Sequence, residues 1–120
     1  MNRFTFVVSL ASTADRDFID IMDWSAEHFS ADAADRYEAL IEQALIDLGD
    51  DPFRPGAKQR PELPQEMFIY HLAGSRDHVA GERVKAPRHF LLYRIDTGRV
   101  VVLRILHDSR NLAQHVPPAV

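Results

Sequence analysis

The sequence predicts an α+β domain in which an N-terminal helical hairpin packs on one face of a small, mainly antiparallel, twisted sheet. Apolar segments rich in β-branched and aromatic residues lie near both ends of the chain, two segments between them repeat apolar residues with helical spacing, and a Pro-rich loop separates the halves. The expected order is β-α-α-β-β-β, followed by a short C-terminal tail or helix. With 120 residues, 46% of them hydrophobic, residues 1–120 can form a single domain with its own core.

The first predicted strand is Phe4–Leu10, which is apolar at nearly every position, and we expect it to be buried on both faces. Ser12 or Thr13 is the expected N-cap of the first helix, because a hydroxyl there can accept a hydrogen bond from a free backbone N–H. The apolar face of this helix is predicted to hold Phe18, Ile21, Met22, Ser25 and Phe29.

The second helix is predicted to begin at Ser30 and to carry Asp32 in its first turn, where the helix dipole favours a negative charge. Gly49 is the residue type expected immediately after a helix, and Pro52 prevents continuation. The predicted apolar stripe consists of Ala33, Tyr37, Leu40, Ile41, Ala44, Leu45 and Leu48. The two helices would then form an antiparallel hairpin with one apolar side and one acidic side.

Three more strands are predicted in the C-terminal half of the chain, at Met67–Leu72, Phe90–Ile95 and Val100–Leu106. The last two strands are joined by the tight turn Asp96–Arg99 and should form a hairpin. The segment Ala73–Pro87 is polar and basic, and we interpret it as a long connection between strands.

Charge is distributed unevenly along the chain, whose net charge is −4. Residues 1–51 contain three Arg against twelve Asp and Glu, whereas residues 52–120 contain eleven Lys and Arg against six Asp and Glu. The two halves therefore either face each other or meet different partners. The overall acidity argues against direct nucleic-acid binding, which needs a dominant positive field.

The residue types exclude several other classes of protein. The chain has no cysteine, which excludes disulfides, a thiolate nucleophile and a Cys-based zinc site. The apolar run near the N-terminus is too short for a secretory signal or a membrane span, so we expect a cytoplasmic protein with no membrane contact. Neither a metal nor another cofactor is expected, because no zinc-helix spacing relates His71, His78, His89, His107 and His115.

The end of the last strand carries the most informative cluster of side chains. Arg104, His107 and Arg110 lie within seven residues, and Arg94 lies on the neighbouring strand. These residues could bind a phosphate or transfer a proton, with His107 as acid or base. The simpler interpretation is that they pair with carboxylates of the helices or of a partner protein. Because successive strand residues point to opposite faces, Arg104 and His107 need not converge.

The chain resembles the RelE/ParE superfamily of bacterial toxin–antitoxin toxins, and within it the ParE branch. The resemblance is carried by the segments RFTFVVSLASTADRDFIDI, ADRYEALIEQALIDLGDDPFRPG, HFLLYRI and RILHDSRNL. The most specific of these is the last, in which the pattern Arg-X-Leu-His-X-X-Arg ends the final strand. The resemblance implies a RelE/ParE-like fold, which coincides with the element order expected above.

The superfamily implies two mechanisms. RelE-like members cut messenger RNA in the ribosomal A site with basic residues and often a C-terminal Tyr, whereas ParE-like members inhibit DNA gyrase and lack those residues. By position, the RelE-type strand-end arginine corresponds to Arg110, but the Tyr corresponds to Val116 and a basic strand position to Phe90. The RelE lysines have only loose counterparts in Lys58 and Lys85. The resemblance therefore favours a gyrase inhibitor that is not an enzyme over a ribosome-dependent mRNA endonuclease.

The resemblance also implies a ParD-like antitoxin that holds the toxin in a hetero-oligomer; a non-toxic protein-binding module on the same fold is the alternative. The residues predicted to bind the antitoxin, by apolar packing or by charge, are Trp24, Phe29, Tyr37, Arg94, Arg104 and Arg110. The residues predicted to bind the target or cause toxicity are His107, Arg110, Leu112 and His115. The connection Ala73–Pro87 is longer than in short ParE toxins, and the sequence assigns it no role.

Overall fold

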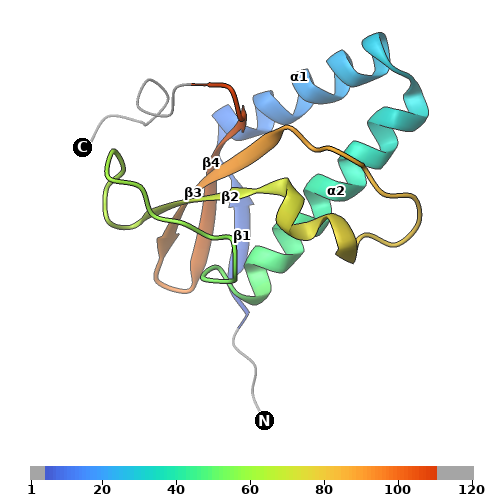
Figure 1. The fold of residues 1–120 in the computed structure, drawn as a ribbon. Helices are drawn as coiled ribbons and strands as arrows, with labels where there is room; N and C mark the ends of the chain where they lie inside the picture. The colour runs from blue at the N-terminus through green and yellow to red at the C-terminus, as the bar shows by residue number, and fades with distance from the viewer. Residues whose placement is uncertain (1–4, 111–120) are drawn as a thin grey trace.

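A computed structural model describes residues 5–110 of the chain, and the elements within them follow the predicted order (Figure 1). The α+β class and the β-α-α-β-β-β order are therefore confirmed. A short 3₁₀ helix, η1, is added between the second and third strands. The elements are β1 (Val7–Leu10), α1 (Ser12–His28), α2 (Ala31–Asp50), β2 (Met67–His71), η1 (Leu72–His78), β3 (His89–Asp96) and β4 (Arg99–His107).

The strands of the described residues form one four-stranded sheet in the order β1-β4-β3-β2. β1 runs parallel to β4, whereas β4 and β2 each pair with β3 in antiparallel fashion. The predicted hairpin is confirmed, because Asp96 lies opposite Arg99 and Gly98 adopts a φ of 67°, in the left-handed region that favours glycine. The sheet is mainly antiparallel, as the sequence indicated.

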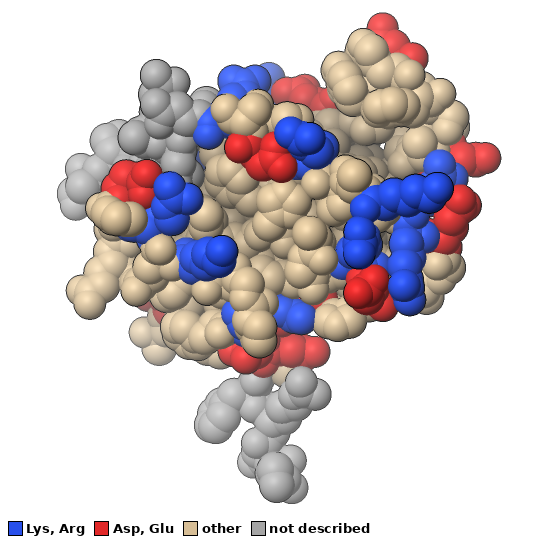
Figure 2. Space-filling model, in the orientation of Figure 1, with Lys and Arg blue, Asp and Glu red and all other residues tan. Residues whose placement is uncertain are grey.

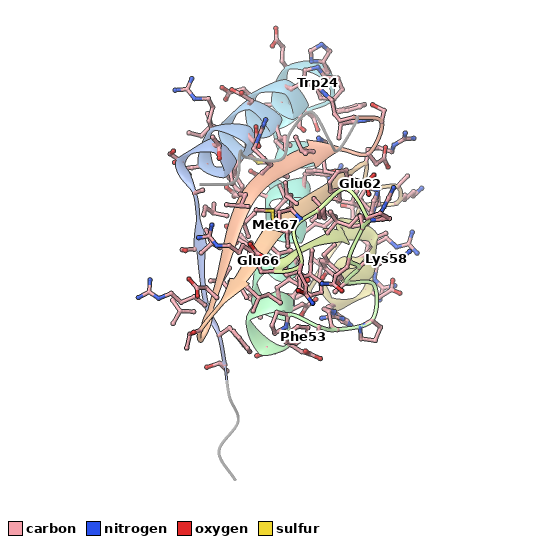
Figure 3. The ribbon with its side chains drawn as sticks, turned by 90° about the vertical axis from the view of Figure 1, so that its left-hand side faces the viewer. Trp24, Phe53, Lys58, Glu62, Glu66 and Met67 are labelled. Carbon is pink, nitrogen blue, oxygen red and sulfur yellow. The ribbon has the colours of Figure 1, made fainter. Side chains whose placement is uncertain are left out.

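The helical hairpin covers one face of the sheet (Figure 1). The apolar stripe of α2 is confirmed at its centre, where Leu40, Ile41 and Leu48 are fully buried against sheet residues such as Tyr93. A smaller apolar cluster covers the opposite face, on which Figure 3 shows Met67. This second cluster consists of Leu63, Met67, Phe90, Leu92, Leu103 and Leu106.

The helix ends differ in part from the prediction. Ser30 caps α2 as expected, since its Oγ accepts a hydrogen bond from the Ala33 N–H at 3.0 Å. Gly49, however, lies inside α2 and does not end it. A Cβ at this position would lie 3.1 Å from Cγ2 of Val8, and the Gly49 carbonyl accepts from the N–H of Phe6 at 2.8 Å. Glycine therefore allows close approach of the segment that leads into β1.

Four other local predictions are wrong, for reasons that lie in tertiary packing. β1 is an edge strand with alternating exposure, so that Val7 is 63% exposed instead of buried. Phe29 follows α1 as its C-cap and is 71% exposed, because the chain turns away from the sheet there. Leu72 belongs to η1 instead of extending β2. The N-cap of α1 is Ala11, without a side-chain hydrogen bond.

The first turns of α1 replace β1 as the partner of β4. β1 pairs with β4 only as far as Val102, and Leu103 lies at a bulge opposite Leu92 and Tyr93. Thr13 does not cap α1, and its hydroxyl instead donates a hydrogen bond to the Leu103 carbonyl at 2.6 Å. α1 thus satisfies backbone groups of β4 that would otherwise form a free edge.

Asp17 completes this junction. Its Oδ2 accepts a hydrogen bond from the Ile105 N–H at 2.9 Å and one from Nε of Arg104 at 2.7 Å, while Oδ1 accepts from a terminal nitrogen of Arg104 at 3.0 Å. Both side chains are largely buried, with exposures of 14% and 26%. The hydrogen bonds that Arg104 donates to Asp17 raise the pKa of Arg104, which therefore stays charged.

We expect Asp17→Ala to lower the free energy of unfolding by about 2–4 kcal/mol, since it leaves a largely buried guanidinium and a backbone N–H without their acceptor. Asp15→Ala, in the same helical turn, is the matched control and should lower it by about 1 kcal/mol or less, through the helix dipole alone. Urea titration measures both. Equal losses for the two variants would show that the Asp17–Arg104 pair contributes nothing beyond the dipole.

Candidate functional site

A groove of about 900 Å³ lies between the far end of the helical hairpin, the segment that precedes β3, and the end of β4. α1 and α2 line one side of it, the segment from Glu82 to Arg88 lines another, and the end of β4 closes it. Five residues that the sequence singled out line this groove together. They are Trp24, Phe29, Tyr37, His107 and Arg110.

The apolar side of the groove is an exposed aromatic cluster at the end of α1. Trp24 is 53% exposed, and Figure 3 shows it at the end of α1 that lies away from the sheet. Its ring stacks on His28 at a centroid distance of 4.3 Å and meets the edge of Phe29 at 5.5 Å. Exposed, mutually packed aromatic rings are typical of protein-binding surfaces.

The floor of the groove is formed by Tyr37 and His89. The Tyr37 hydroxyl accepts a hydrogen bond from the Arg88 N–H at 3.1 Å and lies 2.6 Å from Nδ1 of His89. This geometry allows the hydroxyl to donate its proton to Nδ1 of a neutral imidazole that carries its own proton on Nε2. Burial, together with the nearby His107, lowers the pKa of His89 to about 4, and burial raises the pKa of Tyr37 to about 12. Both side chains are thus uncharged at neutral pH.

His107 of β4 is paired with His89 of β3 in the strand register, with 5.3 Å between the ring centroids. Its Nδ1 accepts a hydrogen bond from the Ser109 N–H at 3.1 Å and lies 2.8 Å from the Ser109 hydroxyl. These contacts hold the imidazole within the turn that follows β4. The arrangement positions the imidazole where it lines the groove.

The rim of the groove is positively charged. Its two carboxylates are Asp20 and Glu82, and Glu82 lies 3.5 Å from Arg36. Figure 2 shows Lys and Arg side chains gathered where Figure 1 places the segment between η1 and β3. The groove therefore combines apolar surface with an excess of positive charge, in a chain whose net charge is −4. Its five cationic residues are Arg36, Arg83, Lys85, Arg88 and Arg110.

Two of the predicted cationic residues lie outside the groove. The guanidinium of Arg104 is held by Asp17, so the interpretation that these cations pair with helix carboxylates holds for Arg104. Arg94 is in register with Met67, a residue of the apolar cluster on the opposite face of the sheet, and with Val101, which packs against that cluster. Leu112 and His115 lie outside the described residues, and their predicted role stays a prediction.

A second, polar cleft of about 500 Å³ lies on the other side of the end of β4. Three of the positions that correspond to RelE catalytic residues, Lys58, Phe90 and Arg110, line it, and so does His71, whereas Lys85 lines the groove and Val116 lies outside the described residues. Figure 3 shows Lys58 well separated from Trp24, so the aromatic cluster and this cleft occupy different parts of the surface. The residues between 5 and 110 contain no group of three side chains suited to hold a metal ion.

Asp108, which lines this second cleft, anchors the turn that follows β4. Its carboxylate accepts hydrogen bonds from Arg88, at 3.0 and 3.2 Å, and lies 3.1 Å from Nε2 of His71. Burial raises the pKa of Asp108, but the hydrogen bonds from His71 and Arg88 lower it by more. A negative charge therefore stands inside the cleft at neutral pH.

The family model of the ParE toxin of type II toxin–antitoxin systems, parDE, matches residues 8–112. The chain belongs to the ParE toxin family. No curated protein is significantly similar to it. None of the helices within residues 5–110 is long and apolar enough to cross a membrane.

Two solved structures place this ParE-family chain among toxin–antitoxin folds. A chain of the toxin–antitoxin complex RelBE2 from Mycobacterium tuberculosis is 25% identical, with a TM-score of 0.56, and the alignment covers 91% of this chain and 98% of that one. A chain of the chromosomal ParDE system from P. aeruginosa is 12% identical, with a TM-score of 0.63, and the alignment covers 87% and 97%. The RelE/ParE-like fold is therefore confirmed.

Sequence reasoning missed the residues that the segment before β3 contributes to the groove. It treated Ala73–Pro87 as a connection, although Arg83 and Lys85 from this segment line the groove. It also missed His89, whose place opposite His107 follows from the register of β3 and β4. The signal that could have found the cations was the basic composition of the connection next to an acidic helical hairpin.

His89 should make the stability of the fold sensitive to mild acid. Because its folded pKa of about 4 lies below the unfolded value of about 6.5, the unfolded chain binds the proton more tightly between these values, and stability falls as the pH falls through that window. We expect His89→Gln to reduce the drop in Tm between about pH 7 and about pH 4.5. The exposed His28, replaced by Gln, is the control. An undiminished drop in the His89 variant would refute this assignment.

Proposed function

We propose that this ParE-family protein is a toxin that a cognate antitoxin neutralises by occupying the groove. Free of antitoxin, the toxin would inhibit DNA gyrase in the cytoplasm without acting as an enzyme. The observation that carries the antitoxin proposal is the groove itself, where exposed Trp24 and Phe29 lie beside an excess of positive charge. The two similar solved chains come from toxin–antitoxin systems, which supports an antitoxin partner.

The chemistry of the site supports gyrase inhibition over RNA cleavage. A nuclease needs a proton acceptor and a cationic clamp around the scissile phosphate. At the basic position of RelE-like nucleases this chain has Phe90, which is only 7% exposed. The carboxylates of Glu62 and Asp108 in the same cleft offset part of its positive charge and so weaken its attraction for a phosphate.

A ribosome-dependent mRNA endonuclease is the second candidate, and one observation favours it. Lys58, Arg60, His71 and Arg110 line a single cleft, so cations and an imidazole lie together. In this candidate the second cleft, and not the groove, would hold the RNA. Nε2 of His71 faces Asp108 and its Nδ1 accepts a hydrogen bond from the Ala73 N–H at 3.0 Å, so the imidazole could accept a proton in this candidate only after one of these contacts breaks.

Purified toxin should inhibit supercoiling by gyrase and cause cleaved DNA to accumulate, while a translation extract stays active. Gel electrophoresis of plasmid DNA and luciferase synthesis measure the two outcomes, and added antitoxin should reverse the first. Ribosome-dependent mRNA cleavage at a comparable toxin concentration would favour the second candidate. If inducing the chain alone slows growth in none of several bacterial hosts, a non-toxic binding module on the same fold becomes the better explanation.

Arginine substitutions should distinguish antitoxin binding at the groove from antitoxin binding at predicted residues outside it. Arg110→Glu places a like charge where the antitoxin is expected to present carboxylates, and we expect it to weaken the complex by about tenfold. Arg94→Glu, outside the groove, should leave the affinity within about twofold of the unaltered chain. Titration calorimetry measures both. A loss confined to the Arg94 variant would move the interface to the opposite face of the sheet.

A further inference from the structure

The segment Val79–Arg88 between η1 and β3, the connection hereafter, contains most of the part of Ala73–Pro87 that follows η1, a stretch that the family resemblance implies to be an insertion relative to short ParE toxins. It lines one side of the groove, opposite the aromatic cluster of α1. Its groove-lining residues alternate in character, with the cations Arg83 and Lys85 next to the apolar Val84 and Ala86. A chain without this insertion would lack these contacts.

The helix η1, which leads into the connection, is tied to α2. Asp47 of α2 is 7% exposed, and its Oδ2 accepts a hydrogen bond from the Ser75 hydroxyl at 2.6 Å and one from Nδ1 of His78 at 2.8 Å. Burial raises the pKa of Asp47, but the hydrogen bonds from Ser75, His78 and Gln43 lower it by more. Asp47 therefore stays ionised and holds η1 in place at neutral pH.

The connection itself is tied near its end. A terminal nitrogen of Arg76 donates to the Lys85 carbonyl at 2.7 Å, and the Arg88 N–H donates to the Tyr37 hydroxyl at 3.1 Å. These hydrogen bonds fix the backbone and leave the Lys85 side chain without an ion pair among the described residues. Arg83 lies 3.3 Å from Asp77, but both side chains are more than half exposed, and such pairs exchange readily with a partner's charge.

We propose that the connection determines which antitoxin this toxin accepts. Arg83 and Lys85 pair with carboxylates of the antitoxin, while an apolar antitoxin side chain lies between Trp24 and Val84. The occupant is thus an acidic, amphipathic segment of the cognate antitoxin. This inference rests on the proposed function of the groove.

Charge complementarity distinguishes this occupant from a second copy of the same chain. If a second copy presented its own groove, the Arg83 and Lys85 of one copy would lie against the Arg83 and Lys85 of the other. Like charges in close contact are unfavourable. An acidic segment instead pairs with Lys85 and with the exposed Arg83, and covers the aromatic rings at the same time. The spacing of two cations around Val84 favours a segment in which acidic and apolar side chains lie side by side.

The test compares two double variants that change the net charge equally. Arg83→Glu with Lys85→Glu reverses the charge of the connection, whereas Arg16→Glu with Arg99→Glu reverses two exposed cations outside the groove. The probe is the product of the small reading frame directly upstream, which is expected to encode the antitoxin. Surface plasmon resonance at about 0.1 M and about 0.5 M NaCl gives the rate constants and their dependence on salt.

We expect the connection variant to raise the Kd at least about tenfold at the lower salt, mainly by slowing association, and the difference to shrink at the higher salt. The control variant should stay within about twofold of the unaltered chain. Replacing the facing antitoxin carboxylates by Lys should restore binding to the connection variant alone. Equal Kd values for the two double variants would overturn the inference while leaving the groove as the antitoxin site.

Failure of the proposed function gives a different result. If the unaltered toxin does not bind the upstream product, the proposed function fails, and this inference fails with it. Thermal melting checks that both double variants fold. Should the charge reversal unfold the chain, Arg83→Gln with Lys85→Gln replaces it; a several-fold rise in Kd then supports the inference, and an unchanged Kd refutes it.

Discussion

The carboxylate of Asp17 joins the helical hairpin to the last strand, and the position of the groove depends on this junction. β4 loses β1 as a partner after Val102, and α1 satisfies the following backbone groups through Thr13 and Asp17. The same carboxylate pairs with the partly buried guanidinium of Arg104. α1 therefore leaves the sheet in a fixed direction. Its far end carries the aromatic cluster, and the end of β4 carries His107, so both sides of the groove are set by one interaction.

The aromatic residues of the groove stay exposed because they are not needed to cover the hydrophobic core. The fully buried side chains lie between α2 and the sheet, whereas Trp24 and Phe29 extend beyond the sheet's edge and stay exposed. Tyr37 and His89 close the floor as an uncharged, hydrogen-bonded pair. The electrostatic character of the groove is consequently set by its rim. A partner that covers the aromatic rings is thereby required to present negative charge.

The sequence left open whether the acidic and basic halves of the chain face each other or meet different partners. The structure gives a reason for both. Some charges of the two halves pair with each other. Asp17 pairs with Arg104, and the Asp47 carboxylate lies 3.2 Å from a terminal nitrogen of Arg54. Of the cations around the groove, Arg88 is held by Asp108, Arg36 and Arg83 pair with the exposed carboxylates of Glu82 and Asp77, and Lys85 and Arg110 have no ion pair within residues 5–110. Intramolecular pairing thus fastens the basic half to the acidic helices and leaves a positive surface at one end for a partner.

The sequence by itself determined the fold class, the element order, the β3–β4 turn and the Ser30 cap, because each depends on residues close together in the chain. Helical spacing identified the buried stripe of α2, and a single glycine at Gly98 identified the turn. Only the tertiary structure decided which predicted site residues meet. It brings Trp24, Phe29 and Tyr37 to His107 and Arg110, and it gives Arg104 to Asp17, 87 residues away. It also turns an apparent loop into one side of the groove. Such contacts depend on register, on a bulge in β4 and on the direction in which α1 leaves the sheet, and none of these is encoded in local residue patterns.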